Sequence, residues 1–226
     1  MRSITRLALD EAAQESLAQR QAAADHKRLT GTLHVNDEWQ KARQTHLLRT
    51  VILGTLRRMM GERERCMYCL DSHGTDIEHF WPKTPFPERM FQWPNMLLCC
   101  TECGRLKGDR FPLSDGQPLV IDPTIDEPWD HLDFDPSTGN IVPRFDLNTD
   151  DWSAKGQATV DVLQLDRREA MASGYRRTFL RLAALVEHHI HSGALFADEL
   201  ISVLSGFDEH GLLGWCFIGT GQQVSP

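Results

Sequence analysis

The sequence predicts an α+β protein in which a small zinc-clipped centre lies between an N-terminal helical segment and a C-terminal helical region. Apolar residues recur at steps of three and four on both sides of the centre, which is the period of a helix that faces a core. Two CxxC pairs bound the centre, and prolines 82, 85, 87 and 94 exclude a long helix between them. We therefore expect three parts, over residues 1–60, 61–115 and 116–226.

The N-terminal segment carries a stripe of mostly apolar residues that is typical of a core-facing helix. Asn36 or Asp37 is a suitable N-cap for this helix. The stripe consists of Trp39, Ala42, His46, Leu47, Thr50, Leu53, Leu56 and Met60.

Within the centre, residues 77–80 predict a short strand and residues 96–99 form a second apolar run. The stretch "TECGRLKGDRF" after Cys100 predicts a short helix that ends at Gly108.

The chain from 119 to 151 is mostly turn formers, so we expect a loop-rich connector with short strands at most, including a strand-like run over 118–121. The last third predicts a helix with one apolar face and a further helix over 194–204. The apolar face consists of Met171, Tyr175, Phe179, Leu182, Leu185, Val186 and Ile190. The apolar tail, "GLLGWCFIGT", is expected to pack on the core or on another chain.

The bulk composition limits the classes of protein that the chain can belong to. Its 226 residues are 41% hydrophobic, which is enough for a buried core. No segment is long enough to span a membrane, and the start, "MRSITRLALDEAAQES", lacks the apolar stretch of a signal peptide. We therefore expect a cytoplasmic protein with no membrane partner, in which paired cysteines bind metal or do redox chemistry more often than they form disulfides.

The net charge of −8 argues against a protein that coats nucleic acid over its whole surface. The charge is uneven, because basic residues gather before and within the centre and acidic residues follow it. This pattern fits a local anion site, and it fits two solvated faces equally well. The basic residues are Arg43, Arg49, Arg57, Arg58, Arg63, Arg65, Lys83, Arg89, Arg105, Lys107 and Arg110.

The four paired cysteines, Cys66, Cys69, Cys100 and Cys103, have the spacing of a structural Zn²⁺ site, in which each CxxC turn points two sulfurs at one ion. A dithiol redox site is the alternative, but it would need a CxxC at a strand-helix junction of an α/β pattern. We interpret Cys99 as buried packing beside a ligand.

The dipeptide Glu78-His79 lies between the two cysteine pairs. A neutral imidazole can take a proton from water, and a carboxylate can hold a hard divalent cation that neutralises charge on a phosphate. Hydrolysis of a phosphodiester needs both functions. The alternative is a histidine that packs among Phe80, Trp81 and Trp93.

The string "CMYC…DIEHFWPK…WPNMLLCCTECGRLKGDRFP" resembles the HNH nuclease superfamily. This resemblance implies a ββα-metal core with His79 as general base, Glu78 as a ligand of the catalytic Mg²⁺ or Mn²⁺, and Asn95 as the residue that orients the loop. It also implies a flanking zinc site of the four cysteines and a Lys107 that meets a phosphate one helical turn on.

The sequence departs from this family at one position. The family has histidine or asparagine nine residues after the central asparagine, where this chain has Gly104. Glycine offers no side chain to a metal. The ion would then be held by Glu78, the substrate phosphate and water, or the protein would be impaired as a nuclease.

A narrower resemblance covers most of residues 40–190, through "EHFWPK", "LVIDPTIDEPWDHLDFDPSTGNIVP" and "VDVLQLDRREAMASGYRR". These strings are similar to the PtuB-type subunit of Septu and retron anti-phage defence systems. The resemblance implies an effector nuclease that works with a PtuA-type ABC/SMC-like ATPase, docked on the helical flanks, and that acts on DNA, with RNA not excluded. The competing hypothesis is a catalytically impaired, zinc-stabilised adaptor that binds a partner or nucleic acid.

Overall fold

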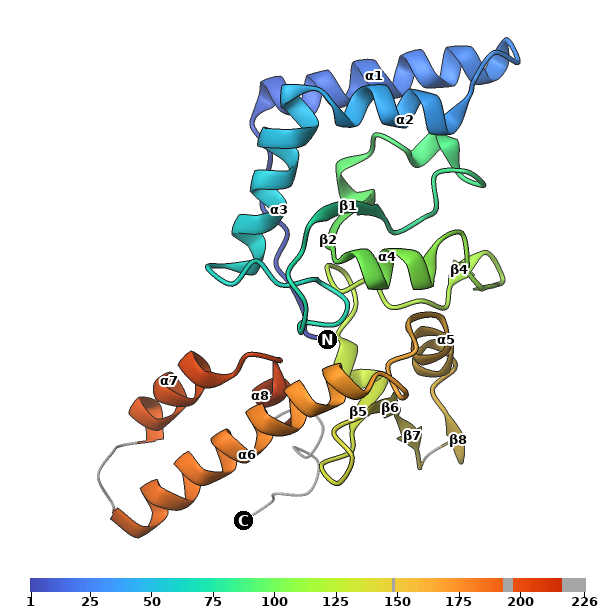
Figure 1. Cartoon of the computed structure of the whole chain (residues 1–226). Helices are drawn as coiled ribbons and strands as arrows, with labels where there is room; N and C mark the ends of the chain where they lie inside the picture. The colour runs from blue at the N-terminus through green and yellow to red at the C-terminus, as the bar shows by residue number, and fades with distance from the viewer. Residues whose placement is uncertain (148, 193–196, 217–226) are drawn as a thin grey trace. The chain divides into compact units, whose positions relative to one another are not determined.

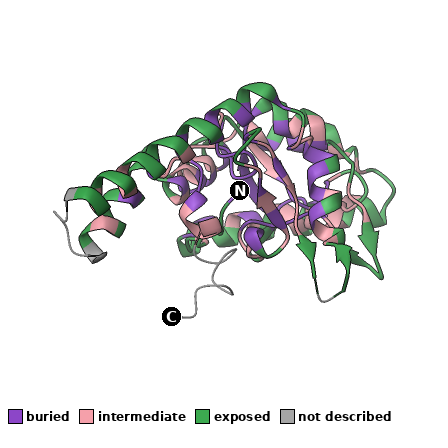
Figure 2. Ribbon diagram, turned by 90° about the horizontal axis from the view of Figure 1, so that it is seen from below, coloured by how far each residue is buried: buried purple, intermediate pink, exposed green. Residues whose placement is uncertain are grey.

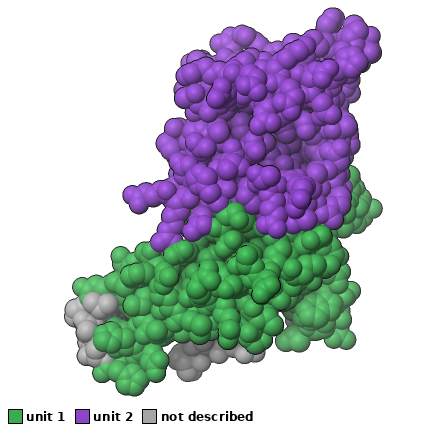
Figure 3. Space-filling view, viewed as in Figure 1, with its two compact units in different colours: residues 1–3, 68–72, 112–226 green, residues 4–67, 73–111 purple. Residues whose placement is uncertain are grey.

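A computed structural model describes residues 1–147, 149–192 and 197–216. It combines helices with two-stranded antiparallel sheets, which confirms the predicted mixture of α and β structure. The chain divides into two compact units (Figure 3). Unit 1 comprises residues 1–3, 68–72 and 112–226, and unit 2 comprises residues 4–67 and 73–111. Each unit is described by itself.

Unit 2 begins with four helical elements (Figure 1). They are α1 (Glu11–Leu29), α2 (Val35–Arg43), the π-helix η1 (Leu47–Ile52) and α3 (Leu53–Met60). Asp10 caps α1 by accepting a hydrogen bond from the Ala13 N–H at 2.7 Å. The expected cap of α2 at Asn36 or Asp37 is wrong, because both lie inside a helix whose N-cap is His34.

The predicted helical stripe is buried at its two ends but not in its middle. Trp39, Ala42, Leu56 and Met60 are buried as expected, whereas the expected residues between them are exposed or half-buried. The buried positions there are Leu48, Ile52 and Thr55 instead. Figure 2 colours the chain by burial, with buried residues in purple. Residues 44 and 45 interrupt the helix, and the π-helical turn that follows takes more residues than an α-helical turn, so the apolar face shifts along the sequence.

The centre of the chain forms two strands followed by a helix. Strands β1 (Asp76–His79) and β2 (Met96–Cys99) pair antiparallel, and α4 (Thr101–Lys107) follows β2. The predicted strands and helix are thus confirmed to within a residue at each end. All four residues of β2 are buried, and the chain before β1 approaches them so closely that a Cβ on Gly74 would lie 2.3 Å from Leu98 Cγ.

The proline-rich loop between the two strands contains only single turns of 3₁₀-helix, η2 (Pro87–Arg89) and η3 (Trp93–Asn95). The absence of a long helix in this loop confirms the expectation drawn from its prolines.

Unit 1 contains short antiparallel hairpins, as the turn-rich composition predicts. The pairs are β3 (Leu113–Ser114) with β4 (Gln117–Pro118), β5 (Leu132–Phe134) with β6 (Ile141–Pro143), and β7 (Phe145–Asp146) with β8 (Asp151–Trp152), and η4 spans Pro128–Asp130. The strand expected over 118–121 is wrong beyond Pro118. The Ile121 N–H bonds to Thr159 Oγ1 at 2.9 Å rather than to a neighbouring strand.

The helices of unit 1 are α5 (Ala154–Leu163), α6 (Glu169–Ser192), α7 (Ala197–Phe207) and α8 (Leu212–Gly214). The predicted apolar face of α6 is buried at Met171, Tyr175 and Leu182, but Ile190 near its end is exposed. The helix expected over 194–204 is α7, although residues 193–196 lie outside the described residues, as does the tail from 217. Among the described helices, none has both the length and the apolar composition that crossing a bilayer requires.

A four-cysteine centre and an adjoining arginine-lined cleft

The four paired cysteines come together in the structure. One sulfur from each of Cys66, Cys69, Cys100 and Cys103 lies within 4.8 Å of the others, and all four residues are buried. Zn²⁺ binds four thiolates at about 2.3 Å in a tetrahedron, so this cluster could hold one such metal ion. The CxxC spacing therefore predicted a real juxtaposition of side chains that are thirty residues apart in sequence.

Cys99 is buried, as expected, and its sulfur lies beside the four-cysteine cluster. Its sulfur is 4.0 Å from Cys66 Sγ and 3.3 Å from the Cys100 carbonyl oxygen. All six cysteines of the chain are free of disulfides. Cys216 is half-buried, and burial is the main cause that raises the pKa of its thiol.

Glu78 and Lys107 form an ion pair beside the cysteine centre. Lys107 Nζ lies 2.8 Å from Glu78 Oε1 and also donates to the His79 carbonyl oxygen at 2.8 Å. The lysine side chain is 0% exposed and the glutamate side chain is 18% exposed. Burial raises the pKa of Glu78, and the ammonium opposes this rise.

This geometry differs from the expected role of Lys107. The resemblance implied that its ammonium, one helical turn on, would meet a phosphate. The structure turns it inward to neutralise Glu78 and to satisfy a strand carbonyl, because the buried carboxylate is otherwise left without a counter-charge.

The His79 imidazole lies on the other side of β1 from Glu78, as successive strand residues do. It is 5% exposed, and its Nε2 is 2.9 Å from the Met90 carbonyl oxygen. Its ring packs edge-on against Trp39 with centroids 4.3 Å apart, whereas the alternative interpretation placed it among Phe80, Trp81 and Trp93. Burial is the main cause that lowers the pKa of His79, to about 3, so the ring is neutral at neutral pH.

Asn95 ties together the two ends of the proline-rich loop. Its Oδ1 accepts from the Trp81 N–H at 2.7 Å, and its Nδ2 donates to the carbonyl oxygens of Trp81 at 3.0 Å and Arg89 at 2.9 Å. The Asn95 carbonyl oxygen accepts from the Phe80 N–H at 2.9 Å. The side chain thus fixes the backbone that directly follows His79.

Gly104 faces Glu78 across α4 and β1. A Cβ on Gly104 would lie 3.6 Å from Glu78 Oε2 and 3.8 Å from Cys99 Sγ, which are ordinary contact distances. The resemblance implies one metal ligand at Glu78 and a second at position 104, and a side chain at position 104 would begin beside Glu78. Glycine itself has no side chain that could bind the metal.

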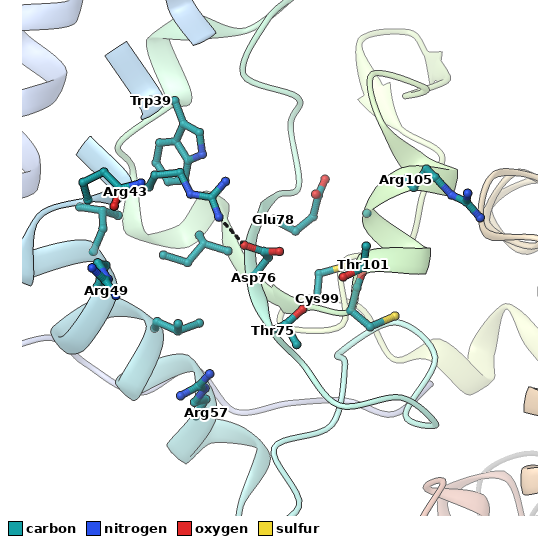
Figure 4. A pocket seen from close by; sticks show the side chains of 16 residues that line it. Trp39, Arg43, Arg49, Arg57, Thr75, Asp76, Glu78, Cys99, Thr101 and Arg105 are labelled. Atoms are coloured by element: carbon teal, nitrogen blue, oxygen red, sulfur yellow. Dashed lines mark hydrogen bonds and ion pairs between the residues drawn. The ribbon is translucent and has the colours of Figure 1, made fainter. Parts of the chain in front are cut away.

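A cleft of about 750 Å³ adjoins these residues (Figure 4). Glu78 and Gly104 line it on one side, and three arginines from α2, η1 and α3 line it on the other, namely Arg43, Arg49 and Arg57. His79 is not a lining residue of this cleft. Phosphate groups are a natural occupant of a cleft whose wall carries guanidinium groups.

Asp76 is a cleft residue that the sequence analysis did not single out. It lies two residues before Glu78 on β1, and alternate residues of a strand share a face. Its Oδ1 accepts from Arg43 Nη2 at 2.8 Å, as the dashed line in Figure 4 marks. The pattern "DIE", which begins one residue before the predicted strand, was the signal that could have identified it.

The chain shares sequence with a protein of known family. It is 31% identical over 112 residues to the Septu protein PtuB of Bacillus thuringiensis. The chain is similar to PtuB. No family model matches it.

The similarity to PtuB confirms the narrower of the two resemblances, the one to a PtuB-type subunit. The aligned part is 47% of this chain and 38% of PtuB. The chain therefore spans about two fifths of the length of this curated relative.

The resemblance also implies a catalytic Mg²⁺ or Mn²⁺, and the carboxylates of the cleft test whether the residues fit one. Glu78 Oε2 is turned toward Gly104 and the cleft, whereas Oε1 is taken by Lys107. Within the described residues, the cysteine centre is the one cluster of three or more histidine, cysteine or acidic ligands. One carboxylate oxygen fits a hard cation that keeps several waters and takes further ligands from a phosphate.

Proposed function

We propose that the chain is a metal-dependent HNH-type endonuclease that hydrolyses phosphodiester bonds, with DNA as the expected substrate. One observation carries the proposal. Glu78 of β1 and Gly104 of α4 line one cleft whose opposite wall carries arginines. The buried four-cysteine cluster lies at the start of this helix. Structural Zn²⁺ would hold the cysteines and fix the positions of β1 and α4.

The side chains have separate tasks in this proposal. A carbonyl oxygen can only accept, so the His79 ring donates its Nε2 proton to Met90 and carries its free lone pair on Nδ1. The resemblance assigns the uptake of a proton from water to this ring, which the structure buries outside the cleft. Asn95 keeps the backbone around His79 in place, and the arginines hold the phosphodiester.

Glu78 would hold the divalent cation through Oε2, with water and the phosphate as its other ligands. When bound, this ion supplies charge neutralisation on the scissile phosphate and on the leaving oxygen.

The test compares plasmid cleavage by the wild-type chain and Glu78→Gln in Mg²⁺ and in Mn²⁺. The substitution keeps the shape of the side chain and removes its charge. Because it also leaves the buried Lys107 ammonium unpaired, thermal unfolding of the variant is measured alongside its cleavage. Cleavage is expected to fall by at least about 100-fold, because one positioned charge at a reacting centre contributes on that scale. Glu11→Gln makes the same chemical change at an exposed position of α1 and should cut like wild type. Equal cleavage by Glu78→Gln would exclude this site.

A second function is favoured by three features of the same site. Gly104 gives no ligand, Lys107 neutralises Glu78, and His79 is buried outside the cleft. These features suit a zinc-stabilised adaptor that binds nucleic acid or a partner without cutting. Binding of a DNA duplex without cleavage in either metal, alone and with the ATPase, would establish this alternative.

We further propose that the chain acts in bacterial anti-phage defence together with a PtuA-type ATPase. The similarity to PtuB over 112 residues supports this assignment. Co-expression with a PtuA-type ATPase should yield a complex that survives gel filtration. The helical part of unit 1 is the proposed docking surface, since Ile190 on α6 and Phe207 on α7 are 72% and 42% exposed. Separate elution of the two proteins would argue against the partnership.

A further inference from the structure

The arginines of the cleft continue into a second hollow on the same helical wall. This hollow, of about 730 Å³, is lined by Arg49, Arg57 and Arg58 together with Gly61, Glu62 and Glu64 at and after the end of α3. Arg49 and Arg57 line both hollows. A single basic wall, made by η1 and α3, therefore runs from the neighbourhood of Glu78 toward Gly61.

Two arginines of this wall have no acidic partner. Arg43 pairs with Asp76 at 2.8 Å, and Arg57 lies 3.3 Å from Glu64 Oε2. Arg49 and Arg58 are exposed, and no carboxylate of the described chain pairs with either guanidinium. Arg58 donates to Thr55 Oγ1 at 2.8 Å, a bond that orients the group without neutralising it.

The spacing of these charges suits a polyanion. Arg49 and Arg57 are eight residues apart across η1 and α3, which is at most about 12 Å at the α-helical rise of 1.5 Å per residue. This length corresponds to about three to four nucleotides of one strand of a B-form duplex. The π-helical turn η1 carries Arg49, and such turns occur frequently at functional sites.

The wall offers phosphate contacts but no surface for bases. Trp39 is the single aromatic residue that lines the first hollow, and it is 6% exposed and packed on His79. No aromatic residue lines the second hollow. Proteins that hold single strands stack the bases on aromatic side chains, and this surface cannot do so. A duplex needs no such platform, because its bases stay stacked on one another.

We propose that the η1–α3 wall is a track for the backbone of double-stranded nucleic acid, with Arg49 and Arg58 holding phosphates of the strand that leads away from Glu78. The recognition is independent of base sequence. The inference rests on the proposed nuclease function, for which it names a duplex as the substrate and the η1–α3 arginines as the residues that position it.

The test is fluorescence anisotropy with a labelled 20-base-pair duplex and a 20-nucleotide oligo-dT, at several salt concentrations and without divalent cations. Compared with the wild-type chain as parent, the double variant R49Q/R58Q should bind the duplex at least about tenfold more weakly at low salt. The slope of log K against log salt should fall in magnitude by about 1.8, since each lost phosphate contact removes about 0.9. The matched control R20Q/R28Q changes two arginines of α1 outside both hollows and should leave slope and affinity unchanged.

An unchanged slope in R49Q/R58Q, tighter binding of oligo-dT than of the duplex by the parent, or no duplex binding by the parent would each overturn the track. The binding assay also separates this inference from the nuclease proposal. Cleavage that persists in R49Q/R58Q with wild-type duplex affinity would refute the proposed track while the nuclease proposal stands. If the wild-type chain binds the duplex in a salt-dependent way but does not cut it, and R49Q/R58Q binds more weakly, the track proposal stands and the nuclease proposal is refuted.

Discussion

The ammonium of Lys107 lies 2.8 Å from Glu78 Oε1 with its own side chain fully buried, so the carboxylate of the candidate site already has a cation beside it. Breaking a buried pair from one side leaves the other charge without compensation. Lys107→Met is therefore expected to lower the free energy of unfolding by about 3 to 5 kcal/mol. Thermal and urea unfolding measure this loss.

The double variant K107M/E78Q serves as the control for that loss. It removes both charges, so it should recover a large part of the stability that Lys107→Met loses. If Lys107→Met is as stable as wild type, the Glu78–Lys107 ion pair does not contribute to the free energy of unfolding.

Gly104→Asn tests whether the missing second ligand limits the site. A side chain at this position begins 3.6 Å from Glu78 Oε2, so an amide oxygen can join the same ion. We expect metal-dependent cleavage to rise by about tenfold and half-maximal activity to need less Mn²⁺, because affinity for hard cations follows the number of oxygen ligands. Gly104→Ala adds the Cβ without a donor and should not show the rise. A loss of cleavage in Gly104→Asn alone would contradict the assignment of this position.

The cysteine centre predicts one Zn²⁺ per chain. Cys100→Ser removes one of four thiolates and should leave purified protein with little zinc, as measured by elemental analysis. Its thermal midpoint should drop by tens of degrees or the protein should fail to fold, because the metal contributes directly to folding. Cys99→Ser changes the adjacent buried cysteine, which is outside the four-sulfur set, and should keep its zinc. Zinc-free wild-type protein would refute the structural metal site.

The buried His79 predicts a loss of stability in acid. Its pKa is lowered to about 3 in the folded chain, against about 6.5 when exposed, so the unfolded state takes up a proton first as the pH falls. The stabilisation is therefore fully present above pH 6.5 and is lost progressively between about pH 6.5 and pH 3.

The comparison uses His79→Gln, in which the side-chain amide can still donate to the Met90 carbonyl oxygen but cannot titrate. The fall in thermal midpoint from pH 7.5 to pH 5.0 should be smaller in this variant than in wild type. Equal falls in the two proteins would show that His79 is solvated or already charged.

The two strands and the helix of the centre could be predicted from the sequence, because apolar runs and chain-breaking residues specify them locally. The apolar run at β2 is a short buried strand, and Gly108 ends α4 at a positive φ of 48° that favours glycine. The CxxC spacing brought Cys66 and Cys103 together in the prediction as it does in the structure, because a shared metal is the simplest use for paired thiolates.

The orientation of side chains within the site is what only the tertiary structure decided. The sequence named His79 and Lys107 but could not show that one ring packs beneath Trp39 and that one ammonium turns inward to Glu78. Nor did a period of three and four reveal the π-helical turn that shifts the buried face to Leu48 and Ile52. Spacing fixes which residues can share a face of one element, whereas burial and charge pairing depend on the other elements that pack against that face.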